Sequence, residues 1–316
     1  MFHVSDLKVD QEHREKYISV YVAMAKILIL ARLTAQSGNL TTAERIKGHM
    51  TEIGHTCELQ STEFFESHKD CRNYIIENKF CCVIGIHLWR AGKLLVDSPV
   101  PFSIVFGGTD LNEHVEDSMK FHVMTLVAEN AKNLVAFSQT MACKAEHLWP
   151  NVKPKLIVQS QAVITCPSEE FAETDMIFKM KECLTANGNE SHFLKNVLRG
   201  TLIIFLVIAG LRPVKDPMFL FEIISDWHKQ DSRVFLVVVG PEIDFEFSIM
   251  VKETAKKYPG VVVLPALSQP DLHALIKHFV VAVVNTSVSE GMAACILEAM
   301  DMSTVVLARK IPGNEC

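Results

Sequence analysis

The sequence has no concentrated run of positive charge. Its 31 lysines and arginines stand against 37 aspartates and glutamates, which gives a formal net charge of −6 at pH 7 over 316 residues. No stretch interleaves basic with aromatic residues as nucleic-acid-binding proteins do. Nucleic acid is therefore not an expected partner.

The cysteines show no metal-binding or disulfide pattern. The nine cysteines are odd in number, scattered, and never spaced as C-x-x-C. A zinc site or a disulfide framework would require regular spacing. We therefore expect a reducing compartment, the cytoplasm.

Long hydrophobic segments are also missing. The longest unbroken apolar run, Leu202–Ala209, is far shorter than the roughly 20 residues that a membrane span needs. The first residues, MFHVSDLKVDQEHREKY, are charged throughout and contain no apolar signal core. We expect no membrane span, with secretion as an alternative only if another start supplies a signal.

The composition that remains is that of a globular protein with about two domains. Hydrophobic residues make up 49% and charged residues 22% of the chain, and the length suffices for two separate cores. Short β-branched apolar runs alternate with amphipathic stretches, a pattern typical of parallel α/β sheets covered on both faces.

The elements expected from this alternation fall into two sets. The first set has strands at 26–31, 81–88, 102–108, 133–138 and 155–159, with a helix over 41–52. The second set has strands at 201–210, 234–240, 261–265, 280–285 and 304–308, with helices near 217–229, 245–258, 270–278 and 292–301.

This division predicts two doubly wound, Rossmann-like α/β domains. The N-terminal domain is expected over 24–165 and the C-terminal domain over 201–316. Residues 166–200 are polar and poorly periodic, so we expect them to connect the domains, and 1–23 to form an N-terminal appendage.

The stretch SVSEGMAACILEAM (287–300) follows a predicted strand and opens a helix. Glu290 and Gly291 thus fall at the carboxyl end of a parallel strand, where ligands bind in open α/β sheets. Gly291 permits close backbone approach, and a helix beginning near Met292 offers free N–H groups to an anion such as phosphate. Glu298 lies about two turns further on, where its carboxylate could accept hydrogen bonds from ribose hydroxyls. Two glutamates at this spacing are by themselves a weak signal.

A second motif, GLRPVKDP (210–217), follows the first strand of the same domain. It places Arg212 and Lys215 on the same rim, where two fixed cations beside a helix N-terminus could clamp a diphosphate. The alternative is a turn in which Pro213 and Pro217 cap a helix and the charges are solvated.

These two motifs, followed by VLARKIPGN (306–314), resemble the group 1, or family 4, glycosyltransferases of the GT-B fold. The resemblance covers about Lys26 to Asn314. It implies that Arg212 and Lys215 hold the diphosphate of the donor, that Glu290 lies by the sugar and that Glu298 binds the ribose. It also implies that backbone amides meet the phosphates at Gly291, Met292 and Ala293.

The chain departs from the family pattern in three places. Many relatives carry His-Gly-Thr-Asp where this chain has Gly107-Gly108-Thr109-Asp110, which leaves Asp110 as an acceptor-side catalytic candidate and His87, after VIGIHL, as a second. Lys215 stands one position earlier than in the family. Relatives continue for about half a domain beyond Cys316, so we expect a truncated C-terminal domain of reduced stability and activity.

The resemblance implies a hexosyltransferase-type enzyme that moves a sugar from a nucleotide-diphosphate sugar to the hydroxyl of an unknown acceptor, with retention of configuration. No Asp-x-Asp motif occurs, and Asp244-Phe245-Glu246 comes nearest to one. Cations and a helix N-terminus can stabilise the leaving diphosphate, so no metal and no cofactor are expected.

Three other functions compete with glycosyl transfer. A nicotinamide dehydrogenase would need G-x-G-x-x-G after the first strand of a domain, which is missing. A nucleotide-sugar epimerase shares the scaffold and stays open, because fold does not fix function. A non-catalytic nucleotide-sugar-binding protein also stays open, favoured by the expected truncation.

Overall fold

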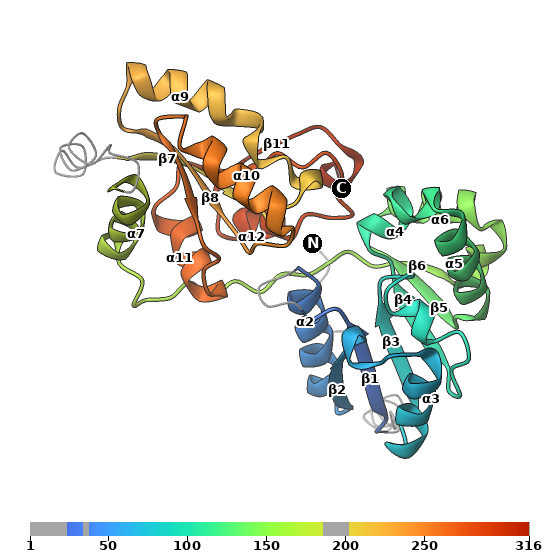
Figure 1. Ribbon diagram of the computed structural model, residues 1–316. Helices are drawn as coiled ribbons and strands as arrows, with labels where there is room; N and C mark the ends of the chain where they lie inside the picture. The colour runs from blue at the N-terminus through green and yellow to red at the C-terminus, as the bar shows by residue number, and fades with distance from the viewer. Residues whose placement is uncertain (1–23, 34–37, 186–201, 316) are drawn as a thin grey trace, which may run out of the picture.

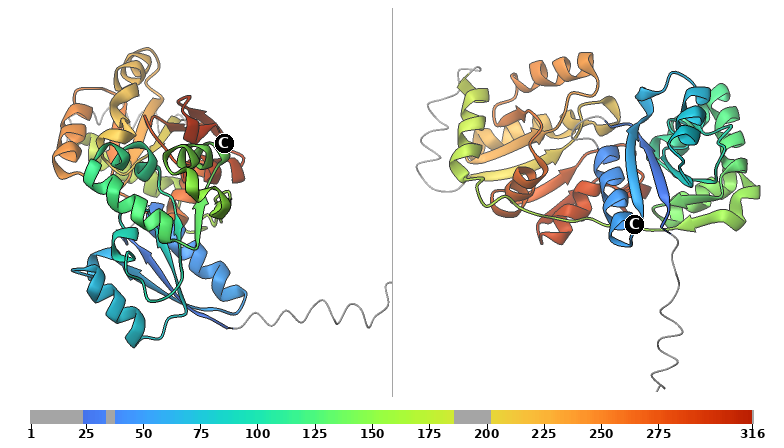
Figure 2. Two further views of the ribbon diagram at one scale, coloured as in Figure 1. Left: turned by 90° about the vertical axis from the view of Figure 1, so that its right-hand side faces the viewer. Right: turned by 90° about the horizontal axis from the view of Figure 1, so that it is seen from below.

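A computed structural model describes residues 24–33, 38–185 and 202–315 of the chain. The described residues form two α/β domains, each built on one parallel sheet, and an extended segment leads from the first domain to the second (Figures 1 and 2). The predicted appendage 1–23 and residues 186–200 of the predicted connector lie outside the described residues.

The N-terminal domain contains a six-stranded parallel sheet in the order β2-β1-β3-β4-β5-β6. Its strands are β1 (Lys26–Ala31), β2 (Thr56–Ser61), β3 (Cys82–Ile86), β4 (Phe102–Val105), β5 (Asn133–Ala136) and β6 (Leu156–Val158). Its α-helices are α2 (Gly38–Glu52), α3 (His68–Glu77), α4 (Gly108–Asn112), α5 (Ser118–Asn130) and α6 (Gln139–Leu148).

Strand β1 shows why this sheet is covered on both faces. Leu28 and Leu30 lie in the core shared with α3, α5 and α6, while Ile27 and Ile29 lie in the core shared with α2. Alternate side chains of a strand point to opposite faces, so an apolar run buries both rows only when helices cover both sides.

The C-terminal domain contains a five-stranded parallel sheet in the order β11-β10-β7-β8-β9. Its strands are β7 (Ile203–Ile208), β8 (Val234–Val239), β9 (Val261–Leu264), β10 (Ala282–Asn285) and β11 (Val305–Ala308). Its α-helices are α7 (Glu173–Thr185), α9 (Phe221–Gln230), α10 (Phe245–Ala255), α11 (Gln269–His278) and α12 (Ala294–Asp301). The predicted fold class, two Rossmann-like parallel α/β domains, is thus confirmed.

Two elements differ from the sequence-based expectation. Residues 173–185, predicted as connector, form α7, and its Met176 and Met180 are buried in the core of the C-terminal sheet. Strand β2, which was not expected, extends the N-terminal sheet beside β1 in parallel. At the other end of the chain, β11 is an edge strand whose Val305 and Leu307 are largely exposed.

Strand order reverses direction once in each sheet. In the N-terminal sheet β1 has β2 on one side and β3 on the other, and in the C-terminal sheet β7 lies between β8 and β10. A crevice forms at the carboxyl ends of the strands at such a reversal, and ligands bind there. The two reversals therefore identify the edges of the sheets at which a site is expected.

Candidate functional site

A cleft with a volume of about 460 Å³ lies between the two domains. Its walls include Arg32 and His87, which follow β1 and β3, and Arg212 and Glu290, which follow β7 and β10. Both reversals of strand order thus open into one cavity. Of the site residues predicted from the sequence, the cleft brings together all but Asp110.

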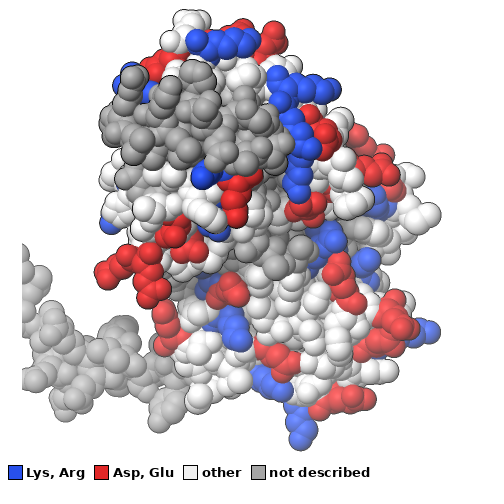
Figure 3. All heavy atoms as spheres, turned by 60° about the vertical axis from the view of Figure 1, so that its left-hand side comes forward, with Lys and Arg blue, Asp and Glu red and all other residues white. Residues whose placement is uncertain are grey.

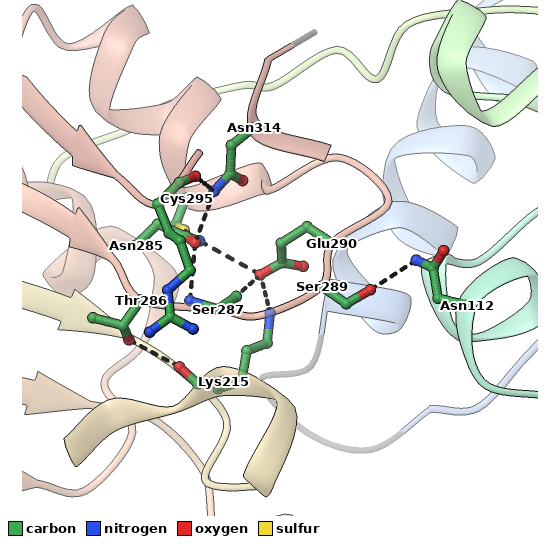
Figure 4. A network of polar contacts seen from close by, with 10 residues as sticks. Asn112, Lys215, Asn285, Thr286, Ser287, Ser289, Glu290, Cys295 and Asn314 are labelled. Carbon is green, nitrogen blue, oxygen red and sulfur yellow. Dashed lines mark hydrogen bonds and ion pairs between the residues drawn. The ribbon is translucent and has the colours of Figure 1, made fainter. Parts of the chain in front are cut away.

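Glu290 and Lys215 form an ion pair in the C-terminal wall. Lys215 Nζ lies 2.5 Å from Glu290 Oε1, and their side chains are only 18% and 11% exposed. The same oxygen accepts hydrogen bonds from Ser287 Oγ (2.7 Å) and Asn285 Nδ2 (3.4 Å) (Figure 4). Burial alone would raise the pKa of Glu290, but Lys215 and these hydrogen bonds hold it below its ordinary value. Glu290 is therefore a carboxylate fixed in the cleft.

Two backbone contacts hold the loops that carry this pair. Thr286 Oγ1 donates to the carbonyl of Lys215 at 2.8 Å, which joins the loop after β10 to the loop after β7. Gly313 passes under Glu290 so closely that a Cβ at Gly313 would lie 2.3 Å from the Glu290 carbonyl oxygen. The segment VLARKIPGN (306–314) therefore packs against the backbone of Glu290 and supports the loop that carries it.

Gly291, Met292 and Ala293 line the cleft where α12 begins. The helix starts at Ala294, and its N-cap residue Ala293 makes no side-chain capping hydrogen bond. No side chain caps the first turn, so the N–H groups that precede Ile296 are available to an anion, whereas the Ile296 N–H donates to the Ala293 carbonyl. Arg212 lines the same cavity from the loop after β7. The residues predicted for a diphosphate clamp thus line one cavity, although the helix begins later than expected.

Glu298 lies deeper in the same wall and is almost completely buried. Gln269 Nε2 donates to Glu298 Oε1 at 3.0 Å. Burial raises the pKa of Glu298 to about 7, although the charge of Arg45 and the hydrogen bond from Gln269 act in the opposite direction. Arg45 belongs to α2, so the N-terminal domain influences this carboxyl group across the cleft.

Asp110 lies behind the cleft wall, contrary to its expected acceptor-side position. Its carboxylate has no exposed surface and accepts hydrogen bonds from the backbone N–H groups of Leu88, Trp89 and Gly107. Burial opposes its ionisation, but His87, His114 and the Gly107 amide hold the pKa of Asp110 well below its usual range. A direct acceptor contact is sterically closed in this arrangement, and Asp110 fixes the loop that follows β3.

His87 lies in the N-terminal wall of the cleft, as expected. Its Nε2 is 3.2 Å from Asn39 Oδ1, and its Nδ1 is 3.2 Å from Thr109 Oγ1 and 3.4 Å from Asp110 Oδ2. Its φ of 74° is in the left-handed region, which a residue with a Cβ adopts at a cost. Such strain is often found at functional sites, and here the Asp110 contacts maintain it.

The two walls touch at one rim of the cleft. Asn112 Nδ2 donates to Ser289 Oγ at 2.7 Å, and Lys144 Nζ donates to Asn112 Oδ1 at 2.7 Å. Beside this bridge the backbones of the two domains are in contact. A Cβ added at Gly108 would lie only 2.6 Å from the Gly291 nitrogen. The loop carrying Glu290 is therefore in direct contact with the N-terminal domain.

Several residues that line the cleft or act on its glutamates were not predicted from the sequence. The lining residues are Arg32, Asn39, Arg90 and Gln269, and those that act on Glu290 or Glu298 are Asn285, Ser287 and Arg45. Arg32 directly follows β1, and Arg90 comes shortly after β3. Because the carboxyl ends of parallel strands carry the ligand sites, this position is the signal that could have identified both arginines. Arg45 and Gln269 lie on helices and carry no comparable signal.

Two general features of the described residues bear on the class of site. Within them, no group of three or more His, Cys, Asp and Glu residues is arranged to hold a metal ion, and no helix is long and apolar enough to cross a membrane. On the face shown in Figure 3, acidic and basic side chains are interspersed rather than gathered by sign.

Two Rossmann-like domains whose strand reversals open into a shared cleft define a GT-B fold. The same class is found among solved structures. Anabaena HepE in complex with UDP and glucose aligns with a TM-score of 0.62 and 14% identity, covering 92% of this chain and 82% of that one. The catalytic domain of starch synthase IV from Arabidopsis thaliana, bound to ADP and acarbose, aligns with a TM-score of 0.60 and 9% identity, covering 92% and 83%.

Sequence comparison defines the family. The glycosyltransferase 1 domain-containing protein 1 of Xenopus tropicalis is 40% identical over 289 residues, which cover 92% of this chain and 79% of that protein. Residues 189–315 also match the family described as glycosyl transferases group 1. The chain belongs to the group 1 glycosyltransferase family.

Proposed function

We propose that this protein transfers a glycosyl group from a nucleotide-diphosphate sugar to an acceptor hydroxyl. The observation that carries the proposal is the meeting of Arg212, Lys215, Glu290, Glu298 and the uncapped start of α12 in one cleft. Each group suits a different part of such a donor, and all lie at the strand reversal of the C-terminal sheet.

The cations and the helix start act on the diphosphate. Negative charge builds up on the leaving diphosphate as the glycosidic bond breaks, and preorganised donors stabilise it. Arg212 can bind phosphate oxygens in a bidentate manner, and Lys215 adds a point charge held in place by Glu290. We propose that these groups suffice without a metal ion or a cofactor.

The two glutamates act on the sugar and the nucleoside. Glu290 is a fixed carboxylate that accepts hydrogen bonds, and sugar hydroxyls are suitable donors to it. Glu298 faces the cleft from α12, where it would accept hydrogen bonds from vicinal ribose hydroxyls. Since HepE is described in complex with UDP and glucose, a UDP-hexose is the first donor to test. This also supports hexosyl transfer as the proposed reaction.

We further propose retention of anomeric configuration, which the family resemblance supports, and a cytoplasmic location. The cysteines within the described ranges are free thiols, in keeping with a reducing compartment. The anomeric configuration of the product, followed by NMR during turnover, tests the stereochemical part directly. An inverted product would overturn it.

Incubation with UDP-glucose labelled in the sugar tests the function. We expect the donor to raise the unfolding temperature, because a ligand that binds the folded state stabilises it, and labelled glycoside to appear when an acceptor mixture is added. Formation of an epimeric nucleotide sugar without acceptor would instead identify an epimerase. Stabilisation by the donor without any turnover over a broad acceptor set would identify a binding protein.

A further inference from the structure

Arg90 lines the cleft but has no role in the donor binding proposed above. It lines the N-terminal wall together with Arg32, at the strand reversal of the N-terminal sheet. Lys215 is paired with Glu290, and Arg32 Nε lies 2.9 Å from Glu63 Oε1. Within the part of the chain that the structure describes, Arg90 makes no direct hydrogen bond or ion pair, although Asp110 and Glu113 attract it electrostatically.

The surroundings of Arg90 contain charges of both signs, since Arg32 and Arg212 repel its guanidinium and the carboxylates of Asp110 and Glu113 attract it. Burial, and then the charges of Arg32 and Arg212, lower the pKa of Arg90, which nevertheless remains far above neutrality as for any arginine. Its guanidinium is half-buried and lines the cleft, so its five N–H donors can reach a ligand there. Partly buried like charges in a cleft also raise the local concentration of anions.

Arg90 is also held in place from behind. Both oxygens of the fully buried Asp110 accept hydrogen bonds from backbone N–H groups just before Arg90, at 2.7 Å for Leu88 and 3.1 Å for Trp89. This geometry fixes the backbone from which the guanidinium reaches the cleft. Preorganisation of this kind is characteristic of binding groups, because it reduces the entropy lost on binding.

We propose that Arg90, assisted by Arg32, binds an oxyanion group of the acceptor, a phosphate or a carboxylate, so that the acceptor is an anionic molecule. This inference rests on the proposed function for its assignment of the C-terminal wall to the donor. Arg212 and Lys215 then serve the donor diphosphate, while Arg90 serves a second negative charge from the opposite wall. A guanidinium matches both oxyanions through two parallel hydrogen bonds.

The test separates the two anion sites by saturating one of them. Wild-type protein saturated with UDP is titrated with inorganic phosphate, and separately with acetate, in a buffer free of both, and the unfolding temperature is followed. We expect at least one of these anions to stabilise the UDP-loaded protein further. Preference for phosphate would indicate a phosphorylated acceptor, and preference for acetate a carboxylated one.

In Arg90→Gln, the affinity of the UDP-loaded protein for this second anion should fall by about tenfold or more, as expected for the loss of a charge-assisted contact. The affinity for UDP should change by less than about threefold. The matched control is Arg72→Gln, since Arg72 is a surface arginine that donates to the Asp97 carbonyl at 2.9 Å. Because the Arg90 side chain makes no hydrogen bond within the described residues, the variant should fold normally, which circular dichroism checks.

Two results would overturn the proposal. The first is a tenfold loss of UDP affinity in Arg90→Gln, which would assign Arg90 to the donor. The second is anion binding that is absent from the UDP-loaded protein or unchanged in Arg90→Gln. If UDP itself fails to bind, the proposed function fails, and the same titrations on Arg212→Gln and on Arg90→Gln/Arg212→Gln still decide whether Arg90 binds an anion.

Discussion

Lys215 carries the charge on which donor binding is expected to depend most. Lys215→Ala removes a charge-assisted contact to the diphosphate worth about 1.5–3 kcal/mol, so we expect UDP affinity in calorimetry to fall roughly ten- to a hundredfold. Lys153→Ala is the control, because Lys153 forms an exposed pair with Glu146 at 2.6 Å. Equal UDP affinities for the two variants would exclude Lys215 from the donor site.

Glu298 should make stability depend on pH. Its pKa in the folded chain is about 7 against an ordinary value of 4.5, so the folded state binds the proton more tightly than the unfolded state does. The resulting stability is present in full below about pH 4.5 and is lost as the pH rises through about 7. Glutamine does not titrate, so only the wild type should lose this stability. The unfolding temperature of Glu298→Gln minus that of the wild type should therefore increase between about pH 5 and about pH 8. A difference in unfolding temperature that does not change with pH would contradict the raised pKa of Glu298.

The same carboxyl group should make donor affinity depend on pH in the opposite direction. A carboxylate accepts hydrogen bonds from both ribose hydroxyls, whereas a protonated carboxyl group accepts less well. UDP-glucose affinity is therefore expected to increase as the pH passes about 7, and this increase should disappear in Glu298→Gln. UDP-glucose is preferred to UDP here because its diphosphate has no ionisation in this range. An unaltered pH profile in the variant would remove Glu298 from the ribose site.

Among the elements, α7 is expected to be part of the C-terminal core. Met180→Ala should lower the free energy of unfolding by about 2–5 kcal/mol, because a fully buried side chain is truncated. Phe178→Ala on the same helix is the control, since Phe178 is 60% exposed and should change stability by less than about 0.5 kcal/mol. Denaturant unfolding measures both, and similar losses would indicate that α7 is only loosely attached.

The loop that begins α4 is expected to control the approach of the two domains. Gly108→Ala places a Cβ 2.6 Å from the Gly291 nitrogen, so the rim must open. We expect a larger radius of gyration in X-ray scattering and slower transfer, with UDP affinity close to that of the wild type. Gly48→Ala is the control, because a Cβ there has no atom within 4 Å. Unchanged scattering in Gly108→Ala would show that the contact does not limit the approach.

The hydrophobic pattern of the sequence predicts the helices and strands whose residues are all or mostly buried. Every residue of β8 is buried, so its uniformly apolar sequence is unambiguous. Strand β2, TCELQS, is a partly exposed edge strand with mixed polarity, and α7 contributes only a narrow buried stripe through Met176 and Met180. Neither has a local pattern strong enough to distinguish it from a loop, and only packing against the sheets reveals both.

Motif spacing predicts site residues that lie in the same loop. It does not predict site residues that are far apart in the sequence and meet only in the folded structure. Glu290 and Gly291 share one loop, so the sequence places them together. Arg90 is a single cation with no characteristic spacing, and Arg45 approaches Glu298 only because the domains face each other. Asp110 was misplaced because the sequence does not show that the backbone of 88 and 89 folds over it.

At the scale of the whole molecule, the two walls should respond to different ligands. We expect UDP to slow backbone hydrogen exchange in 210–215 and 287–298, since bound ligand suppresses local opening. Adding phosphate should extend this protection to 87–90. Helix α3, on the far side of the N-terminal domain from the cleft residues (Figure 1), is the internal control and should not change. Protection of 210–215, 287–298 and 87–90 by UDP alone, with α3 unchanged, would indicate a single, shared anion site.

The contact between Gly108 and Gly291 also bears on the fate of the activated sugar. A sugar nucleotide in the cleft can pass its glycosyl group to the acceptor or lose it to solvent, and water is the more abundant competitor. Enzymes avoid such side reactions by closing the site around the reactants. Here the closest approach is backbone against backbone, with the side-chain bridge from Asn112 to Ser289 beside it. The yield of glycoside per donor consumed would then depend on how closely two glycine backbones approach each other.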